Sequence, residues 1–327
     1  MRAIVIEKPG GPEVLSMREV DDPLPGKGEV RVRVRATAVN RADLLQRRGA
    51  YPAPPDSPAD IPGLEFAGQV EALGPGHHEV AVGDRVMGIA GGGAYAELLV
   101  VPSRTLVRMP SGMAFVEAAA IPEAFITAFD ALVLQGGLRA GDEVLVSAVG
   151  SGVGTAAVQI IRALGARSLG TARTAAKLER AQADLGLDAF VLAADGRFAD
   201  GVLAETGGRG VDLVLELVGG AYVAEDLACT APLGRIVLVG LMAGARADVD
   251  LGLVLRKRLT LRGTVLRSRP IEEKIAVSRA FAQQMLPLFA RGALRPIVGS
   301  VMSFTRAGEA HALSEKNETF GKLVLSV

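Results

Sequence analysis

The sequence is poor in the residues that form disulfides and metal sites. Its 327 residues include one cysteine, Cys229, and three histidines. A lone cysteine excludes an intrachain disulfide, and its surroundings, Leu-Ala-Cys-Thr, indicate a packed side chain rather than a nucleophile. His77 and His78 are adjacent in an expected turn, where neighbouring side chains rarely converge on one metal ion. We expect His311 on a C-terminal helix, either at the surface or packed.

An excess of one charge and long apolar runs are also absent. Lys plus Arg and Asp plus Glu number 36 each, so the formal net charge is zero, which argues against nucleic acid or anionic lipid as a partner. No run approaches the roughly 20 apolar residues that span a bilayer. The first residues, MRAIVIEKPGGPEVL, begin as a strand and lack the apolar core of a signal peptide. We therefore expect a cytoplasmic protein that is long enough for two domains.

Residues 142–167, DEVLVSAVGSGVGTAAVQIIRALGAR, carry the strongest functional signal. An apolar run at 144–146 leads into a glycine turn, and a helical pattern of apolar residues follows at once. A strand, a tight turn and a helix in this order aim free backbone N–H groups and a helix N-terminus at a phosphate. The segment therefore predicts a dinucleotide site, and a dinucleotide points to hydride transfer.

The glycines of this turn are densely clustered, although their spacing differs from the strict G-x-G-x-x-G. Gly150, Gly152 and Gly154 surround Ser151. Gly152 would let the chain pass close to a pyrophosphate, and Gly154 would let the helix pack against the strand. Taken alone, the cluster is equally compatible with an ordinary strand-to-helix turn.

The pattern of this segment repeats along the chain. Further short apolar runs, separated by helical patterns, occur at residues 166–172, 189–192, 211–218 and 235–240. Alternating strands and helices predict an α/β fold with a doubly wound parallel sheet. Ligands of such sheets lie beyond the carboxyl ends of the strands, so the turn after Gly240 is expected to touch a nicotinamide.

The end of the second run bears on the choice of coenzyme. It reads Thr171-Ala172-Arg173, and Lys177 follows one turn into the next helix. An NAD site usually has an acid here that holds the ribose hydroxyls, whereas two cations favour a 2′-phosphate. We therefore predict NADPH rather than NADH. The alternative is that both cations simply solvate the start of a helix.

Residues 1–120 have a different pattern, in which glycine and proline turns separate short strands. The expected strands are residues 4–7, 29–38, 65–73, 85–89 and 96–101, which together predict a barrel-like β domain. A short helix is expected at 40–48 and a proline-rich extended loop at 51–62. A helix at 271–290 and strands at 298–302 and 322–327 are expected to rejoin this domain and to leave a ligand cleft between two lobes.

Several strings together resemble one known family over essentially the whole chain. They are AVNRADLLQRRGAY, IPGLEFAGQV, LGPG, VGDRVMG, AAAIPEAFITAFDAL, SGVGTAAVQ, LMAG, LRSRP and FGKLVL. The sequence is identified as a member of the medium-chain dehydrogenase/reductase superfamily. Within it, the sequence most resembles the zinc-free NADPH:quinone oxidoreductases of the tumour-suppressor-inducible branch, with zeta-crystallin a more distant relative.

The resemblance implies a GroES-like catalytic domain at residues 1–122 and 266–327 and a Rossmann NADPH-binding domain at 123–265. It also implies a homodimer, and an edge strand at 259–265 could pair with its twin across a two-fold axis. It implies no metal, because Asn40 and Leu64 stand where zinc-dependent relatives have a cysteine and a histidine.

The resemblance assigns further residues to the coenzyme. The expected contacts are Thr127 near the nicotinamide side of the phosphates; Ser151, Gly152, Val153 and Gly154 at the pyrophosphate; Val218 and Gly219 at the adenine-side ribose; Gly240, Leu241 and Met242 at the nicotinamide; and Asn317 and Lys322 in the segment that closes over the coenzyme. Close relatives carry a tyrosine near the adenosine phosphate where this sequence has Phe190-Val191-Leu192, so one contact to the 2′-phosphate is expected to be missing.

The implied reaction is zinc-independent hydride transfer from the nicotinamide to a quinone. Tyr51 is the candidate donor to the acceptor oxygen; the alternative is that Tyr51 only lines the pocket and orients the ring. Asn40 would hydrogen-bond the nicotinamide ribose or the substrate. Glu65 is expected to be structural and paired with an arginine, and Asp43 is expected to position the helix that Asn40 begins.

Two other functions remain open at this point. An enone or alkenal double-bond reductase would use the same coenzyme and cleft. A zeta-crystallin-like protein would bind NADPH in a structural or RNA-binding role, although the neutral charge and the few aromatic residues argue against RNA.

Overall fold

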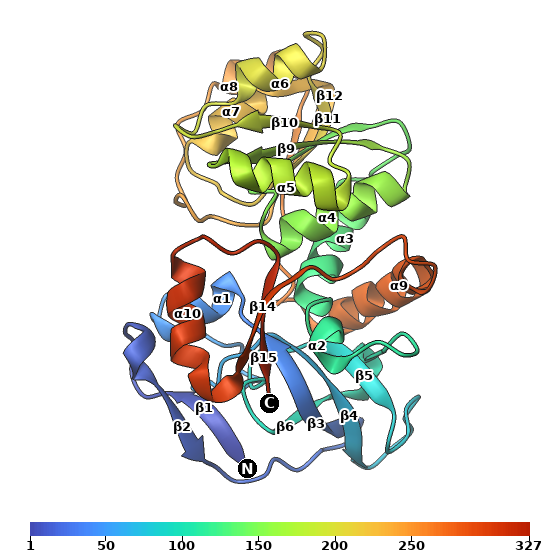
Figure 1. Ribbon diagram of the computed structural model, residues 1–327. Coiled ribbons are helices and arrows are strands. Elements are labelled where there is room, and N and C mark those ends of the chain that lie inside the picture. The colour runs from blue at the N-terminus through green and yellow to red at the C-terminus, as the bar shows by residue number, and fades with distance from the viewer. The chain divides into compact units, whose positions relative to one another are not determined.

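The computed structural model describes all residues, 1–327, and the chain divides into two compact units (Figure 1). Unit 1 comprises Met1–Ile126 together with Leu266–Val327, and unit 2 comprises Thr127–Val265. The tail of the chain therefore belongs with the N-terminal residues. The domain break that we place at residues 122–123 from the sequence lies inside a π-helix, η3 (Pro122–Ile126).

Unit 2 is built around a six-stranded parallel sheet with the strand order β10-β9-β8-β11-β12-β13. This is the order of a doubly wound sheet, in which the chain starts in the middle and reverses direction once, so the expected α/β fold is confirmed. The strands are β8 (Glu143–Val146), β9 (Arg167–Ala172), β10 (Ala189–Leu192), β11 (Val211–Glu216), β12 (Thr230–Leu238) and β13 (Thr260–Gly263).

A helix follows each of the first five strands of this sheet. They are α4 (Gly152–Ala163), α5 (Ala175–Leu185), α6 (Ala199–Glu205), α7 (Tyr222–Cys229) and α8 (Leu251–Lys257). Central strands such as β8 are apolar because both faces of a parallel sheet are covered. Val144, Leu145 and Val146 of β8 are all fully buried. Cys229, at the end of α7, is also fully buried, as expected of a packed side chain.

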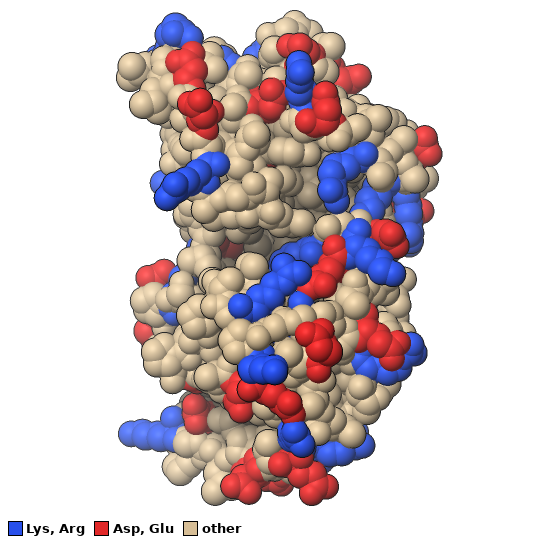
Figure 2. All heavy atoms as spheres, turned by 90° about the vertical axis from the view of Figure 1, so that its left-hand side faces the viewer, with Lys and Arg blue, Asp and Glu red and all other residues tan.

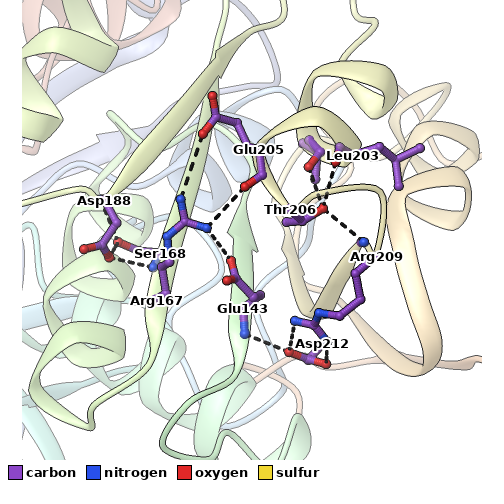
Figure 3. Close-up of polar contacts among 11 residues, drawn as sticks. Glu143, Arg167, Ser168, Asp188, Leu203, Glu205, Thr206, Arg209 and Asp212 are labelled. Carbon is purple, nitrogen blue, oxygen red and sulfur yellow. Dashed lines mark hydrogen bonds and ion pairs between the residues drawn. The ribbon is translucent and has the colours of Figure 1, made fainter.

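The amino ends of these strands are joined by polar side chains (Figure 3). Arg167 of β9 donates to the carboxylate of Glu143 of β8 at 2.8 Å, and the N–H of Glu143 donates to Asp212 of β11, also at 2.8 Å. Arg209 forms a two-pronged ion pair with Asp212 at 2.7 and 2.9 Å. These contacts join the strands at their amino ends. Ligands of such sheets bind on the opposite side, beyond the carboxyl ends of the strands.

Unit 1 contains a mostly antiparallel seven-stranded sheet with the order β14-β15-β3-β4-β5-β7, in which β6 also pairs with β3, and a separate hairpin of β1 and β2. The strands are β1 (Arg2–Ile6), β2 (Leu15–Glu19), β3 (Glu29–Ala38), β4 (Glu65–Leu73), β5 (Arg85–Ile89), β6 (Leu98–Pro102), β7 (Val107–Arg108), β14 (Val298–Ser303) and β15 (Lys322–Ser326).

The central strand β3 shows why this sheet forms where it does. Val30, Val32 and Val34 alternate with arginines and are at most 2% exposed, which is the period of a strand with one buried face. The C-terminal strand β15 pairs antiparallel with β3, with Val324 opposite Ala38. The expected return of the tail to the N-terminal strands is thus confirmed.

The helices of unit 1 are α1 (Arg41–Arg47), α2 (Phe115–Ala118), α9 (Ile271–Ala290) and α10 (Ala307–Glu315), with short 3₁₀ turns at η1 (Pro12–Val14), η2 (Ser103–Thr105) and η5 (Phe304–Arg306). The stretch after α2 is mostly π-helical. It runs through η3, α3 (Thr127–Phe129) and a second π-helix, η4 (Asp130–Gln135). π-helical turns are rare and often occur at functional sites.

The surface carries both signs of charge. Figure 2 shows Lys and Arg mixed with Asp and Glu over one face of the molecule, in line with a formal net charge of zero. No helix has the length and apolar character needed to cross a membrane. The edge strand β13 is exposed along all four of its residues.

Candidate active site

A buried carboxylate positions Asn40 in unit 1. The backbone N–H of Asn40 donates to Oδ2 of Asp43 at 2.8 Å, and Oδ1 of Asp43 accepts from the N–H of Gly63 at 3.0 Å. Asp43 is fully buried, and burial raises its pKa to about 6 although both N–H bonds oppose the shift. Asp43 therefore fixes the start of α1 beside Asn40, as the sequence predicts.

The side chain of Asn40 belongs to a buried ion-pair network. Its amide Nδ2 donates to Oε1 of Glu65 at 2.9 Å, and its Oδ1 accepts from Nζ of Lys322 at 2.6 Å. Nζ of Lys322 also lies 2.6 Å from Oε1 of Glu65. The expectation that Glu65 pairs with an arginine is wrong, because its partner is Lys322.

The pairing of three strands explains why these side chains meet. Asn40 follows β3, Glu65 begins β4 and Lys322 begins β15. Strands β4 and β15 both pair antiparallel with β3, on its two sides, so their first residues lie beside the end of β3. The side chains of Glu65 and Lys322 are 0% and 6% exposed.

This network does not fit a zinc ion. Zinc sites in proteins use at least three ligands from Cys, His, Asp or Glu. No group of three such side chains in the structure is placed to hold a metal ion. At the site itself, the ammonium group of Lys322 already neutralises Glu65, and Asn40 offers only an amide.

Arg267 holds Tyr51 in place. The guanidinium of Arg267 lies 5.0 Å from the centre of the Tyr51 ring and donates to the carbonyl of Tyr51 at 3.2 Å. It is only 6% exposed and also donates to the carbonyl of Gly91 at 2.7 Å and to Oε1 of Gln46 at 2.5 Å. Burial raises the pKa of the Tyr51 hydroxyl, which is therefore protonated at neutral pH.

Glu123 is a residue that the sequence analysis does not single out. It lies on η3, and its backbone N–H donates to Oε2 of Glu65 at 2.9 Å. Burial and, secondly, the charge of Glu65 raise the pKa of the Glu123 carboxyl to about 8, while Lys322 opposes the shift. The feature of the sequence that could have indicated Glu123 is that it is the single carboxylate within the apolar run AAAIPEAFITAF.

His311 is packed, and Tyr95 connects it to Asp43, because the hydroxyl of Tyr95 lies 3.5 Å from Oδ2 of Asp43. His311 is fully buried on α10, with Nε2 3.1 Å from the hydroxyl of Tyr95. Burial lowers the pKa of His311 to about 3. Asn317 follows α10 with a φ of +57°, and its Oδ1 accepts from Arg41 of α1.

In unit 2, the turn between β8 and α4 presents free backbone donors. Oγ of Ser151 caps α4 by accepting from the N–H of Gly154 at 3.0 Å. The N–H groups of Gly152 and Val153 open the helix and have no intrahelical acceptor. Ser151, Gly152 and Val153 are partly exposed. This arrangement suits an anion at the helix N-terminus.

Gly154 is required by the close packing of α4. A Cβ at Gly154 would lie 2.6 Å from the carbonyl oxygen of Ala148 and 2.7 Å from that of Val149. Ala148 itself has a φ of +48°, an unfavourable value for a residue with a side chain. The tight turn after β8 therefore depends on the absence of a side chain at Gly154.

The carboxyl end of β9 carries cations and no carboxylate. Arg173 is exposed directly after β9, and Lys177 is partly buried in the first turn of α5. Thr127, which begins α3, is partly exposed.

The turn after β11 is held by two buried carboxyl groups. Oε1 of Glu216 accepts from the N–H groups of Val218 and Gly219. Those two donors are thus occupied within the chain. Glu216 and Asp226 are fully buried against each other, and burial raises the pKa of both, that of Asp226 well above its usual range.

The turns after β11 and β12 pack together. The carbonyl of Val218 accepts from the N–H of Ala243 at 2.7 Å, and a Cβ at Gly240 would lie 2.4 Å from the carbonyl oxygen of Leu217. Leu241 and Met242 are 55% and 50% exposed. The turns that follow β11 and β12 therefore lie side by side beyond the carboxyl ends of these two neighbouring strands.

The sequence matches two known families. Residues 26–111 match the family described as "Alcohol dehydrogenase GroES-like domain", and residues 152–286 match the family described as "Zinc-binding dehydrogenase". A quinone oxidoreductase of Pseudomonas aeruginosa is 34% identical over 97% of this chain and 96% of its own length.

Solved structures show the same fold over the full chain. That of Escherichia coli quinone oxidoreductase complexed with NADPH has a TM-score of 0.89 at 28% identity and covers 100% of both chains. That of an NAD-dependent alcohol dehydrogenase has a TM-score of 0.87 at 36% identity, again with 100% of both chains covered. The chain is therefore an oxidoreductase and belongs to the quinone oxidoreductase family of the medium-chain dehydrogenases/reductases.

Proposed function

We propose that this protein reduces quinones with NADPH by hydride transfer that needs no zinc. The observation that carries the proposal is the dinucleotide-type turn between β8 and α4, combined with the two cations at the end of β9. The free N–H groups of Gly152 and Val153 would bind the pyrophosphate. Arg173 and Lys177 would bind the 2′-phosphate, since no carboxylate stands at this strand end to hold a free ribose. When bound, the coenzyme supplies the hydride.

The remaining coenzyme contacts are proposed on the same basis. Ser151 and Gly154 would shape the phosphate turn, and Thr127 would lie near the phosphates. Gly240, Leu241 and Met242 would flank the nicotinamide, and Asn317 would help to enclose the coenzyme. Val218 and Gly219 would approach the ribose by van der Waals contact, because Glu216 already takes their N–H groups.

Zinc independence rests on the buried network of unit 1. A metal ion there would have to displace the ammonium of Lys322 from Glu65. Lys322 would contribute to coenzyme binding mainly by fixing the side chain of Asn40. The amide of Asn40 would hydrogen-bond the nicotinamide ribose or the substrate. A quinone suits such a site because it accepts a hydride without a Lewis acid. Tyr51, fixed by Arg267, would orient the flat acceptor ring.

We further propose a homodimer that pairs through β13. All four residues of this edge strand are exposed, and an unpaired strand edge readily binds a second copy of itself. Size-exclusion chromatography with light scattering should give the mass of two chains, and a one-chain mass would overturn the dimer without affecting the proposed reaction.

The function is tested by titration followed by turnover. Fluorescence titration should show saturable NADPH binding, with NADH at least about tenfold weaker if the two cations each add a charge-assisted hydrogen bond. The protein, freed of metal with a chelator, should then oxidise NADPH with 1,2-naphthoquinone faster than with a 2-alkenal. Preference for the alkenal would favour double-bond reduction. Binding without any turnover would favour a coenzyme-binding protein, and activity that depends on stoichiometric zinc would refute the zinc-free reaction.

A further inference from the structure

We propose that the carboxyl group of Glu123 is the proton donor to the reduced acceptor, an inference that rests on the proposed function above. The donor would thus be a side chain on the π-helical turn η3 rather than the hydroxyl of Tyr51. Three observations in unit 1 support this assignment: the anchoring of Glu123, the saturation of its charged neighbours, and its protonation state.

The backbone of Glu123 is anchored on the buried network. Its N–H donates to Oε2 of Glu65 at 2.9 Å, while the other oxygen of Glu65 is held by Lys322 and Asn40. The main chain at Glu123 is therefore tied to the residues that surround Asn40. Glu123 is mostly buried but keeps some exposed surface. No group within the chain donates to its carboxyl oxygens, which leaves them available to a ligand.

The neighbouring cations are engaged elsewhere. The ammonium of Lys322 is shared between Glu65 and Asn40, and the guanidinium of Arg267 donates to Gly91, Tyr51 and Gln46. Neither cation forms an ion pair with Glu123. Removal from water and the negative charge of Glu65 therefore dominate at this carboxyl group.

Glu123 is consequently a carboxylic acid at neutral pH, since these two effects raise its pKa to about 8. The other titratable groups that act on it are Asp43, which reinforces the shift, and Lys322 and Arg267, which oppose it. A donor works best when its pKa lies near the working pH. The pKa of the nearby Tyr51 hydroxyl is raised above the ordinary value for a phenol, which makes it the weaker acid of the two.

The proton balance of the step is complete. A quinone that receives a hydride gains an electron pair and one hydrogen and becomes the singly deprotonated hydroquinone, while the coenzyme is oxidised. The O–H bond of Glu123 breaks as the new O–H bond forms on the acceptor oxygen, which yields the neutral hydroquinone. Glu123 is left as a carboxylate and recovers its proton from water.

The test is the pH dependence of turnover in Glu123→Gln. In the wild type, kcat should fall above about pH 8, as the acid is lost. E123Q should lose about 100-fold or more in kcat, the usual contribution of a general acid, and should show no fall near pH 8. NADPH affinity, measured by fluorescence titration, should stay within about twofold, which a misfolded variant would not do. Glu273→Gln, an exposed glutamate on α9, serves as the matched control.

A second variant keeps the test decisive if E123Q folds poorly. Glu123→Asp retains the acid on a shorter arm, so it should recover part of kcat together with the alkaline fall. Unchanged kcat and an unchanged pH profile in E123Q would overturn the proposal.

Each assay is run with 1,2-naphthoquinone and with a 2-alkenal. A wild type that reduces only the alkenal refutes quinone reduction but still tests Glu123, and a wild type that reduces neither overturns both proposals.

Discussion

The ammonium group of Lys322 lies 2.6 Å from Oε1 of Glu65, and both side chains are almost completely buried. One residue begins β15 and the other begins β4, so the contact forms only when the last strand of the chain joins the sheet beside β3. A buried ion pair of this kind is costly to break, because removal of one partner leaves an unpaired charge in the interior.

We expect Lys322→Met to destabilise the protein by about 3–5 kcal/mol, because the carboxylate of Glu65 loses its buried partner. Urea denaturation at pH 7 measures this change in the free energy of unfolding. Lys316→Met, at an exposed lysine, should change it by at most about 0.5 kcal/mol. The double variant E65Q/K322M should be more stable than K322M alone. Equal stability of K322M and the control would contradict a structural role for the pair.

Arg173 and Lys177 should govern the choice between the two coenzymes. Each charge-assisted hydrogen bond to a phosphate is worth about 1.5–3 kcal/mol, so Arg173→Ala and Lys177→Ala should each weaken NADPH binding about 10- to 100-fold. NADH lacks the phosphate and should bind as before. Calorimetric titration with both coenzymes provides the measurement, and Arg180→Ala, farther along α5, is the control. An equal loss of affinity for NADH would instead indicate a general role in folding this helix.

A side chain at position 154 should disrupt the phosphate turn. The Cβ of Gly154→Ala would lie within 2.7 Å of two carbonyl oxygens, so α4 must move away from β8. We expect a loss of stability of about 1–3 kcal/mol and a loss of NADPH binding. Gly263→Ala, where a Cβ meets nothing within 4 Å, is the matched control in the same unit. Full NADPH affinity in G154A would rule out the proposed use of this turn.

The paired carboxyl groups of Glu216 and Asp226 should make stability pH-dependent. Both oxygens of Asp226 and Oε2 of Glu216 lack a partner unless the two groups share a proton. Because the pKa of each is raised on folding, the stabilising protonation is complete below the unfolded carboxyl pKa of about 4. It is lost progressively as the pH rises through the folded pKa.

The corresponding measurement is the free energy of unfolding at pH 5, 7 and 9. It should decrease from pH 5 to pH 9 in the wild type. In Asp226→Asn the decrease should be smaller, because the amide of the new side chain can donate to Glu216 and has no proton to lose. Asp43 and Glu123 titrate in the same direction in both proteins, so the difference between the two curves isolates the pair. Superimposable curves would show that no proton is shared.

Tyr51→Phe should separate orientation from proton donation. The ring and its contact with Arg267 are preserved in this variant, and only the hydroxyl is lost. If Tyr51 orients the acceptor, KM should rise about fivefold, the value of one neutral hydrogen bond, with kcat nearly unchanged. Steady-state kinetics with several quinones make the distinction. A large fall in kcat with KM constant would return the donor role to Tyr51.

The local pattern of the sequence was sufficient for most of the architecture. The alternation of valine and arginine predicts β3 with the bounds that the structure shows, 29–38, because a strand with one buried face must alternate. The order of strand, glycine turn and helix at 142–167 likewise predicts β8 and α4. The π-helical turns of η3 and η4 could not be predicted in this way, because their apolar residues do not reveal the extra residue in each turn.

The sequence by itself determined the fold class, the glycine turn between β8 and α4 and the two cations at the end of β9, since each depends on residues close together in the chain. Only the tertiary structure decided the partner of Glu65 and the acidity of Glu123. Both depend on which distant strands meet beside β3 and on how much water they exclude, and the pKa of a carboxyl group follows from burial and from its charged neighbours rather than from local sequence.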